Sequence, residues 1–358
     1  MKINFNFKER VRRLKISMNK EGIEALLINR KERIYYLTGY SAEDSFLLIS
    51  PKKNYLFTDA RYKEILRINK YTFEAIISKE PLKGLARLIS GLNLKRTGIE
   101  QRYLNVNQYI FLKKSLNKVK LVPSARILNS MMVIKDEDEI KAIRQAIHIT
   151  ANAFNYSKRL KKAGRTEKEI AALLDFYILT HGADRGGYET MVISGVRTAC
   201  AHAQSSDKKI NSKANLLIDL GAKIYGYNSD LTRVYTLSKM KTGFSKILSI
   251  VIKAQQEAIQ KVSHGRKISE VGLAARNYFK KFKLEKYFIH STGHGVGLNV
   301  HEAPAISLNN TECLKAGMVF TIEPGIYLPG RFGIRVEDIV LVTKNGYEVL
   351  SNDIPNSI

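Results

Sequence analysis

Residues 290–304 read HSTGHGVGLNVHEAP, a glycine-rich stretch that carries His290, His294 and His301. The glycines between them let the backbone approach a ligand closely because they have no side chain. A single histidine in such a stretch would be an ordinary structural residue. Three histidines within twelve residues instead indicate a binding site, whose further members are expected among acidic residues elsewhere in the chain.

Four acidic residues outside this stretch have the right surroundings. Glu323 lies in TIEPG and Glu337 in RVED, whereas Asp219 ends the apolar run LLID and Asp230 follows in YNSDLTRV. Both aspartates border predicted strands, where a buried carboxylate must be paired, hydrogen-bonded or bound to a metal ion. Either aspartate alone would be an ordinary turn or strand-end residue. Together with His294, the four acids form a predicted set of metal ligands.

The chemistry of this set points to hydrolysis. Four carboxylates and one imidazole are hard, oxygen-rich ligands that suit a pair of ions such as Mn²⁺ or Co²⁺ with bridging carboxylates. Two close ions can lower the pKa of a shared water molecule and stabilise a tetrahedral oxyanion. The sequence has neither a G-x-S-x-G motif nor a P-loop, and GHGVGL has the wrong spacing and context for dinucleotide binding. No covalent nucleophile is therefore expected.

The composition is that of a globular protein, with 44% hydrophobic and 26% charged residues among 358. The two cysteines, Cys200 and Cys313, exclude a CxxC metal site and argue against a disulfide scaffold, and we expect both to be small buried side chains. Neither a signal-peptide core nor a bilayer-spanning run of about 18 apolar residues is found. We therefore expect a cytoplasmic protein without a membrane partner.

The charge is strongly basic, with 59 Lys and Arg against 33 Asp and Glu and a formal net charge of +26. Such a charge can attract nucleic acid or another polyanion. The basic residues are nevertheless spread along the chain, without a dense basic block or an aromatic platform for single strands. We interpret the charge as a generally basic solvated surface and do not expect a nucleic-acid partner.

Two domains are predicted, 1–130 and 131–358, which meet where short strands give way to long helices. The first is expected to be α/β, with a helix at 8–20 and strands at 25–28, 45–49, 55–57 and 73–77. The second begins with an acidic helix start at Asp136–Glu139 and is expected to be α+β. Its predicted helices cover 137–162, 166–181, 244–263 and 269–282, and its predicted strands cover 188–194, 216–220, 234–237, 319–322 and 335–342.

Four segments agree in order and spacing with one known family. They are DLGAKIYGYNSDLTR (219–233), HSTGHGVGLNVHEAP (290–304), TIEPGIYLP (321–329) and GIRVEDIVLV (333–342). The chain here resembles the creatinase/aminopeptidase P/prolidase family of pita-bread metallopeptidases. YYLTGYSAEDSFLLIS and LFTDARY, near the start of the chain, resemble that family's N-terminal domain. The resemblance implies a creatinase-like α/β N-terminal domain followed by an α+β pita-bread catalytic domain.

The resemblance also implies a role for each predicted ligand. The site would hold two divalent metal ions, with Mn²⁺ preferred and Co²⁺ or Zn²⁺ as alternatives. Asp219 would bind one ion, and Asp230 and Glu337 would bridge both. His294 and Glu323 would complete the shell of the second ion.

Five further residues match functional positions around the metal ions in that family. His202, in SGVRTACAHAQSSDK, and His301 would stabilise the tetrahedral intermediate, and Arg335 would steady the bridging glutamate as a catalytic residue. His290 would line the specificity pocket, with a satisfied core imidazole as the alternative. Tyr327 would also bind substrate, although a purely packing role is the competing interpretation.

The implied activity is that of an exopeptidase that hydrolyses Xaa-Pro bonds through a metal-bridging hydroxide, on peptides with proline at the second position. Aminopeptidase P-like and Xaa-Pro dipeptidase activities both remain open, and family precedent implies a homodimer. The additional domain 1–130 argues against a methionine aminopeptidase, and the full set of ligands argues against creatinase. The alternative from a different class is a catalytically inactive pita-bread module that binds protein or RNA.

Overall fold

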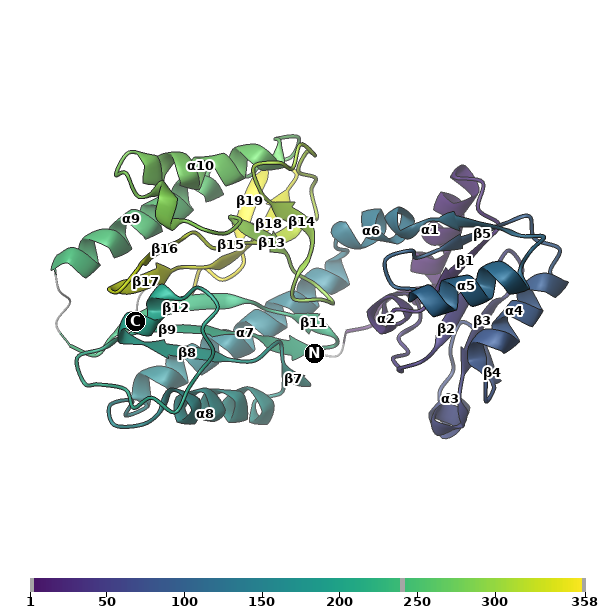
Figure 1. Cartoon of the computed structure of the whole chain (residues 1–358), viewed down its shortest axis with the longest axis horizontal. Coiled ribbons are helices and arrows are strands. Elements are labelled where there is room, and N and C mark those ends of the chain that lie inside the picture. Colours follow the sequence, from purple (N-terminus) through teal and green to yellow (C-terminus); the bar gives the residue numbers. More distant parts are fainter. Residues whose placement is uncertain (1–2, 239–241, 356–358) are drawn as a thin grey trace. The chain divides into compact units, whose positions relative to one another are not determined.

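The structure is a computed structural model that describes residues 3–238 and 242–355. The chain divides into two compact units, Lys2–Met132 and Val133–Ile358 (Figure 1). Each unit has its own hydrophobic core, so the two are taken in turn.

A mixed sheet of six strands forms the centre of the first unit, in the order β4-β3-β2-β1-β5-β6. The strands are β1 (Ala25–Ile28), β2 (Phe46–Ile49), β3 (Asn54–Thr58), β4 (Glu74–Ile77), β5 (Arg96–Ile99) and β6 (Lys120–Pro123). β1 pairs antiparallel with β2 and parallel with β5. Every residue of β1 and β2 is buried, as expected of strands covered on both faces. The predicted α/β class is confirmed.

Helices cover this sheet. They are α1 (Phe7–Lys20), α2 (Lys31–Thr38), α3 (Lys63–Ile68), α4 (Pro81–Gly91), α5 (Val106–Ser115) and α6 (Ala125–Val133). Leu85 and Ile89 of α4 and Leu112 of α5 share one core with Leu27 and Phe57 of the sheet. These positions recur at helical spacing, which is why α4 presents an apolar stripe to the strands.

The second unit combines four long helices with several small sheets. The helices are α7 (Glu137–Arg159), α8 (Glu167–Thr180), α9 (Thr242–Ile259) and α10 (Ile268–Lys280). α7 and α8 pack on one group of strands, and α9 and α10 pack on another (Figure 1). Asp136 and Glu139 form a capping box at the start of α7, which confirms the predicted acidic helix start.

Two sheets of the second unit carry the predicted ligands. The first has the order β12-β9-β8, and the second has the order β14-β13-β15-β18-β19. Their strands are β8 (Met191–Ser194), β9 (Asn215–Leu220), β12 (Leu231–Thr236), β13 (Gly293–Gly295), β14 (Glu302–Ile306), β15 (Val319–Ile322), β18 (Asp338–Thr343) and β19 (Gly346–Val349). The shorter strands are β7 (Arg185–Gly186), β10 (Ala222–Ile224), β11 (Tyr227–Asn228), β16 (Gly325–Leu328) and β17 (Phe332–Arg335).

The predicted strand at 335–342 is interrupted in the structure. β17 ends at Arg335 and pairs with β16, whereas β18 begins at Asp338 and pairs with β15. The chain changes sheet at Val336 and Glu337, where two consecutive acids, Glu337 and Asp338, interrupt the apolar residues of the predicted strand. The two acids have different surroundings: Glu337 lines the cavity of the predicted site, whereas Asp338 lines another cavity.

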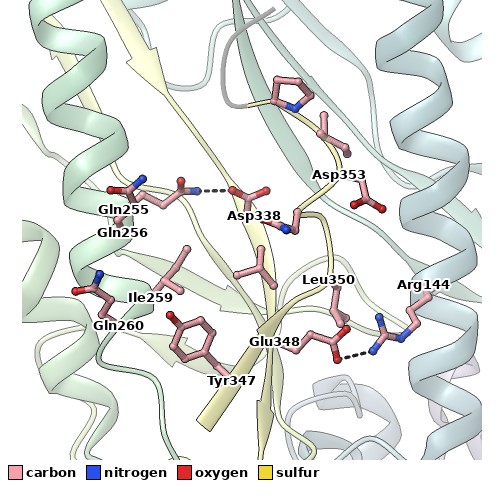
Figure 2. A pocket seen from close by; sticks show the side chains of 14 residues that line it. Arg144, Gln255, Gln256, Ile259, Gln260, Asp338, Tyr347, Glu348, Leu350 and Asp353 are labelled. Atoms are coloured by element: carbon pink, nitrogen blue, oxygen red, sulfur yellow. Dashed lines mark hydrogen bonds and ion pairs between the residues drawn. The ribbon is translucent and has the colours of Figure 1, made fainter.

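Asp338 faces a cavity of about 710 Å³ that is distinct from the predicted site (Figure 2). Its carboxylate accepts hydrogen bonds from Gln255 Nε2 (3.0 Å), Arg233 Nη2 (2.6 Å) and Ser351 Oγ (2.6 Å). These contacts tie α9 and the C-terminal segment to the strands. Asp338 therefore belongs to the structural core, whereas Glu337 belongs to the candidate site.

Two further predictions concern the surface. The expectation that both cysteines are buried is wrong, because Cys200 and Cys313 are exposed. Both lie in loops outside the hydrophobic clusters, where a small side chain has no core to enter. Among the described residues, none of the helices combines the length and the apolarity that crossing a bilayer requires.

Candidate metal centre

The five predicted ligands come together from the two sheets. Asp219 is on β9, and Asp230 immediately precedes β12. His294 is on β13, Glu323 follows β15, and Glu337 precedes β18. All five line one cavity of about 340 Å³.

The register of the first sheet brings its two aspartates to the same end. β9 and β12 are antiparallel, and Thr232 lies opposite Asp219. The connecting segment returns tightly, because a Cβ at Gly221 would lie only 2.1 Å from Ser229 O. Glycine is therefore required at 221 for the hairpin to close and for Asp230 to reach Asp219.

Glycines also place His294. A Cβ at Gly293 would lie 1.9 Å from Thr321 O, and one at Gly295 would lie 2.2 Å from Ala303 O. The glycines noted in the sequence thus allow β13 to approach its two neighbouring strands. His294 Nε2 then lies 3.5 Å from Asp230 Oδ2 and 3.4 Å from Glu323 Oε1.

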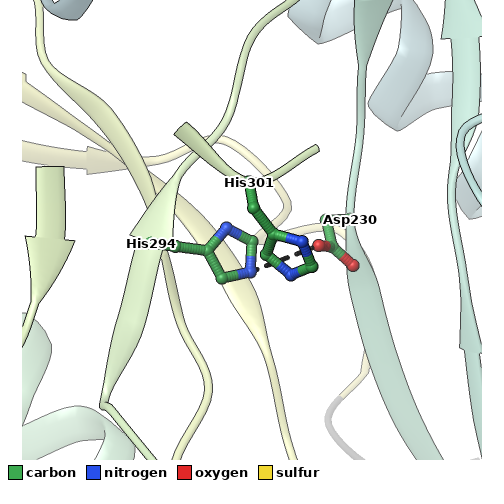
Figure 3. A group of neighbouring side chains, drawn as sticks. All are labelled: Asp230, His294 and His301. Carbon is green, nitrogen blue, oxygen red and sulfur yellow. Dashed lines mark ion pairs between the residues drawn. The ribbon is translucent and has the colours of Figure 1, made fainter. Parts of the chain in front are cut away.

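Among the residues that the structure describes, three overlapping groups of side chains could each hold a metal ion, with ligand atoms within 4.8 Å of one another. One contains Asp219, Asp230 and Glu337, and a second contains His294, Glu323 and Glu337. The third adds His301 to Asp230 and His294 (Figure 3). All five predicted ligands thus occur in groups of suitable geometry, and Asp230, His294 and Glu337 are each shared between two groups.

Electrostatics favour a cation at this position. Burial raises the pKa of Asp230, Glu323 and Glu337 well above the usual range, and neighbouring carboxylates raise it further. The charge of Arg335 acts in the opposite direction on all three. A divalent cation would offset the remaining negative charge, so the donor set fits the hard metal ions expected from the sequence.

Other side chains hold the carboxylates in place. The Tyr188 hydroxyl donates to both Asp219 and Asp230. Thr232 Oγ1 donates to Glu337 Oε2 at 2.7 Å, and Arg335 donates both to Thr232 Oγ1 (3.0 Å) and to Asp219. Neither Tyr188 nor Thr232 is conspicuous in the sequence, because a tyrosine or threonine beside a strand is ordinary.

The predicted substrate residues lie around the same cavity. His202, His290, His301 and Arg335 line it. Tyr327 is only 3% exposed and lies behind them, where its hydroxyl accepts from Arg335 Nη1 (2.9 Å) and contacts His290 Nε2 (3.0 Å). Tyr327 is thus placed to orient His290 and Arg335.

Three of the cavity histidines, His290, His294 and His301, are held in the neutral form. Burial, and next the charge of Arg335, lower the pKa of His290 to about 4. Burial, and next the charge of His301, lower that of His294 to about 4, and burial also lowers the pKa of His301. A neutral imidazole can ligate a metal ion or accept a proton, so these side chains are ready for either role at neutral pH.

Comparison with known proteins agrees with this geometry. Residues 141–344 match metallopeptidase family M24, and residues 10–134 match the creatinase/prolidase N-terminal domain. The Xaa-Pro dipeptidase of Pyrococcus horikoshii is 34% identical over 345 residues, which cover 96% of this chain and 97% of the relative.

Solved structures extend this agreement to the fold. The X-Pro aminopeptidase of Thermotoga maritima superposes with a TM-score of 0.92 at 34% identity, covering 98% of this chain and 99% of that one. The Xaa-Pro dipeptidase of Bacillus anthracis gives a TM-score of 0.93 at 30% identity, covering 99% of each chain. The predicted pita-bread architecture and the family resemblance are confirmed. The chain is a metallopeptidase that belongs to family M24 and carries a creatinase/prolidase N-terminal domain.

Proposed function

We propose that this metallopeptidase is an exopeptidase that uses two divalent metal ions to hydrolyse Xaa-Pro bonds. The observation that carries the proposal is the convergence of four carboxylates and one imidazole, from two different sheets, at one cavity. Relatives named as Xaa-Pro dipeptidases and as an X-Pro aminopeptidase support the same substrate class. Mn²⁺ is the proposed ion, with Co²⁺ or Zn²⁺ as alternatives.

The five ligands would divide between the two ions. Asp219 would hold one ion, His294 and Glu323 the other, and Asp230 and Glu337 both; Glu337 belongs to the candidate group with Asp219 and to the one with His294 and Glu323. When bound, the ions would lower the pKa of a water molecule and would offset the negative charge that develops on the carbonyl oxygen of the substrate.

The protein side chains perform the remaining steps. His202 and His301 line the cavity and can donate hydrogen bonds to the oxygen on which negative charge develops. Arg335 fixes Asp219, and through Thr232 it also supports Glu337. His290, oriented by Tyr327, is the proposed contact for the proline ring, because it is neutral and borders the cavity.

Both an aminopeptidase and a dipeptidase activity agree with the named relatives. We favour the aminopeptidase or a mixed activity, in a cytoplasmic homodimer. The inactive protein-binding or RNA-binding module is not favoured, because the complete ligand set is present and its side chains converge.

A peptide panel with the metal-reconstituted protein tests the proposal. Xaa-Pro, Xaa-Pro-Xaa and matched peptides with alanine in place of proline are compared in the presence of Mn²⁺, Co²⁺ or Zn²⁺. We expect turnover only with proline at the second position, and we expect Asp230→Ala and Glu337→Ala to abolish it. Glu348→Gln, at an exposed ion pair with Arg144, is the control and keeps activity. Absence of turnover with every ion would refute the proposal.

A further inference from the structure

We propose that Lys135 and Glu302 form a positioning pair that fixes the turn at residues 296–302 and, through it, His301. The kinetic part of this inference rests on the proposed peptidase function. Neither residue lines the cavity, and they are separated by 167 positions in sequence. Their effect on the reaction must therefore be transmitted by the turn that joins them to His301.

The first partner is a lysine held inside the second unit. The Lys135 side chain is 1% exposed, and its Nζ lies 2.7 Å from Glu302 Oε1. Its backbone is fixed as well, because Lys135 N donates to Gly317 O at 2.8 Å and the preceding Ile134 forms a bridge with Met318. A buried ammonium group needs a charged partner, and this carboxylate provides it.

The second partner organises the turn. Glu302 Oε2 accepts a hydrogen bond from Asn299 N at 3.2 Å. A Cβ at Gly297 would lie 2.5 Å from Glu302 Oε1, so the carboxylate occupies the space that a side chain at 297 would fill. The turn is therefore folded around the Glu302 carboxylate, while Lys135 neutralises its charge from the other side.

The opposite side of the turn is attached to the metal centre. Asn228 donates from its backbone N (2.9 Å) and from Nδ2 (2.8 Å) to Gly297 O, and Nδ2 also lies 3.1 Å from Leu298 O. Asn228 precedes Asp230 by two residues in the same hairpin. The turn is thus held between the strand that supplies Asp230 and the pair formed by Lys135 and Glu302.

His301 depends on this arrangement because it directly precedes Glu302. Its ring lies 4.1 Å from that of His294, centroid to centroid, in an edge-to-face contact (Figure 3). Loss of the lysine charge would leave a partly buried carboxylate without its cation, and the carboxylate would turn toward solvent. The turn would then loosen and displace His301, and a shift of about 1 Å in a catalytic group can reduce the rate about 100-fold.

Kinetics of a double-mutant cycle test this route. We expect Lys135→Met to lower kcat on an Xaa-Pro-Xaa peptide by about 10-fold to 100-fold, with a smaller change in KM. In a His301→Ala background, Lys135→Met should cause little further loss, because His301 is the group through which it acts. A merely structural lysine would lower kcat by the same factor in both backgrounds, and that result would overturn the proposal. Arg144→Met, at the exposed pair with Glu348, is the matched control and should leave kcat unchanged.

Hydrogen–deuterium exchange provides a second readout that requires no activity. In Lys135→Met we expect faster exchange at the amides of residues 296–302, with unchanged exchange in α9 and β9. Unchanged exchange in the turn, or acceleration throughout the second unit, would contradict a local positioning role. The two proposals can fail separately. If the unmodified protein cleaves no peptide but Lys135→Met still shows faster exchange in the turn, the proposed function is refuted, whereas the role of the pair in fixing the turn is supported.

Discussion

Replacement of Tyr188 by phenylalanine should weaken metal binding while leaving every predicted ligand in place. The hydroxyl of Tyr188 donates to Asp219 and to Asp230, and it is the only part of the side chain that the substitution removes. Hydrogen bonds to charged groups contribute about 1.5–3 kcal/mol each. Water can replace part of this contribution, because Tyr188 lines the cavity.

The expected magnitude follows from these two effects. Loss of a group that orients metal ligands typically reduces metal affinity about 10-fold to 100-fold. That range corresponds to about 1.4–2.7 kcal/mol, which is close to the value of the one charged hydrogen bond that the single hydroxyl proton can share between Asp219 and Asp230. We therefore expect Tyr188→Phe to raise the Kd for Mn²⁺ by about 10-fold to 100-fold.

Competition between the protein and a fluorescent chelator for Mn²⁺ would measure this change. Tyr235→Phe is the matched control, because Tyr235 is a buried tyrosine that does not line the cavity and whose hydroxyl, like that of Tyr188, is hydrogen-bonded, in its case to Ser157. We expect the control to leave the Kd for Mn²⁺ unchanged. An unaltered Kd in Tyr188→Phe would show that the hydroxyl does not organise the carboxylates, and the reasoning would be refuted.

Three other predictions follow from the described contacts. Gly293→Ala should destabilise the second unit by about 3 kcal/mol, because the added Cβ would clash with Thr321 O. Gly91→Ala is the control and should be tolerated, because no other part of the chain lies within 4 Å of the added Cβ. The unfolding temperatures of the two variants would test this difference. Asp338→Asn should lower the unfolding temperature, because it removes the charge that pairs with Arg233. The variant and the unmodified protein should have the same Kd for Mn²⁺, which would show that the substitution does not disturb the metal site. Metal binding should weaken as the pH falls, because burial and neighbouring carboxylates raise the pKa of Asp230, Glu323 and Glu337, so protons compete with the cation at these groups. Calorimetry in buffers of different ionisation enthalpy would detect the protons that the cation displaces, and binding that is independent of pH would contradict the prediction.

The sequence could predict the parts of the site in which residue type and spacing are unusual. Three histidines among glycines are rare, so His294 and its neighbours stood out, and Glu323 and Glu337 then followed in suitable contexts. The structure places these residues together with Asp219 and Asp230. The α/β class of the first unit and the α+β class of the second could also be predicted, because the spacing of apolar residues reflects which face of a helix or strand is buried.

Other parts depend on long-range contacts that spacing cannot reveal. Tyr188 reaches Asp219 from 31 positions away, and Thr232 reaches Glu337 from 105 positions away. The change of sheet before Asp338 could not be predicted, because the hydrophobic residues on both sides of Glu337 and Asp338 are typical of strands and do not reveal which sheet each part joins. Cys200 was assigned to the interior from the average behaviour of free cysteines, and only its position in a loop places it at the surface.

The buried position of Lys135 has a practical consequence for dividing this protein. The second unit begins at Val133, only two residues before Lys135. A truncated protein that starts a few residues after Lys135 would lack the ammonium group that pairs with Glu302 in the turn. Such a shortened protein would retain all five predicted metal ligands and would still lack a part of its catalytic framework. The first residues of the second unit therefore belong to the catalytic part of the peptidase and should be kept in any shortened version of it.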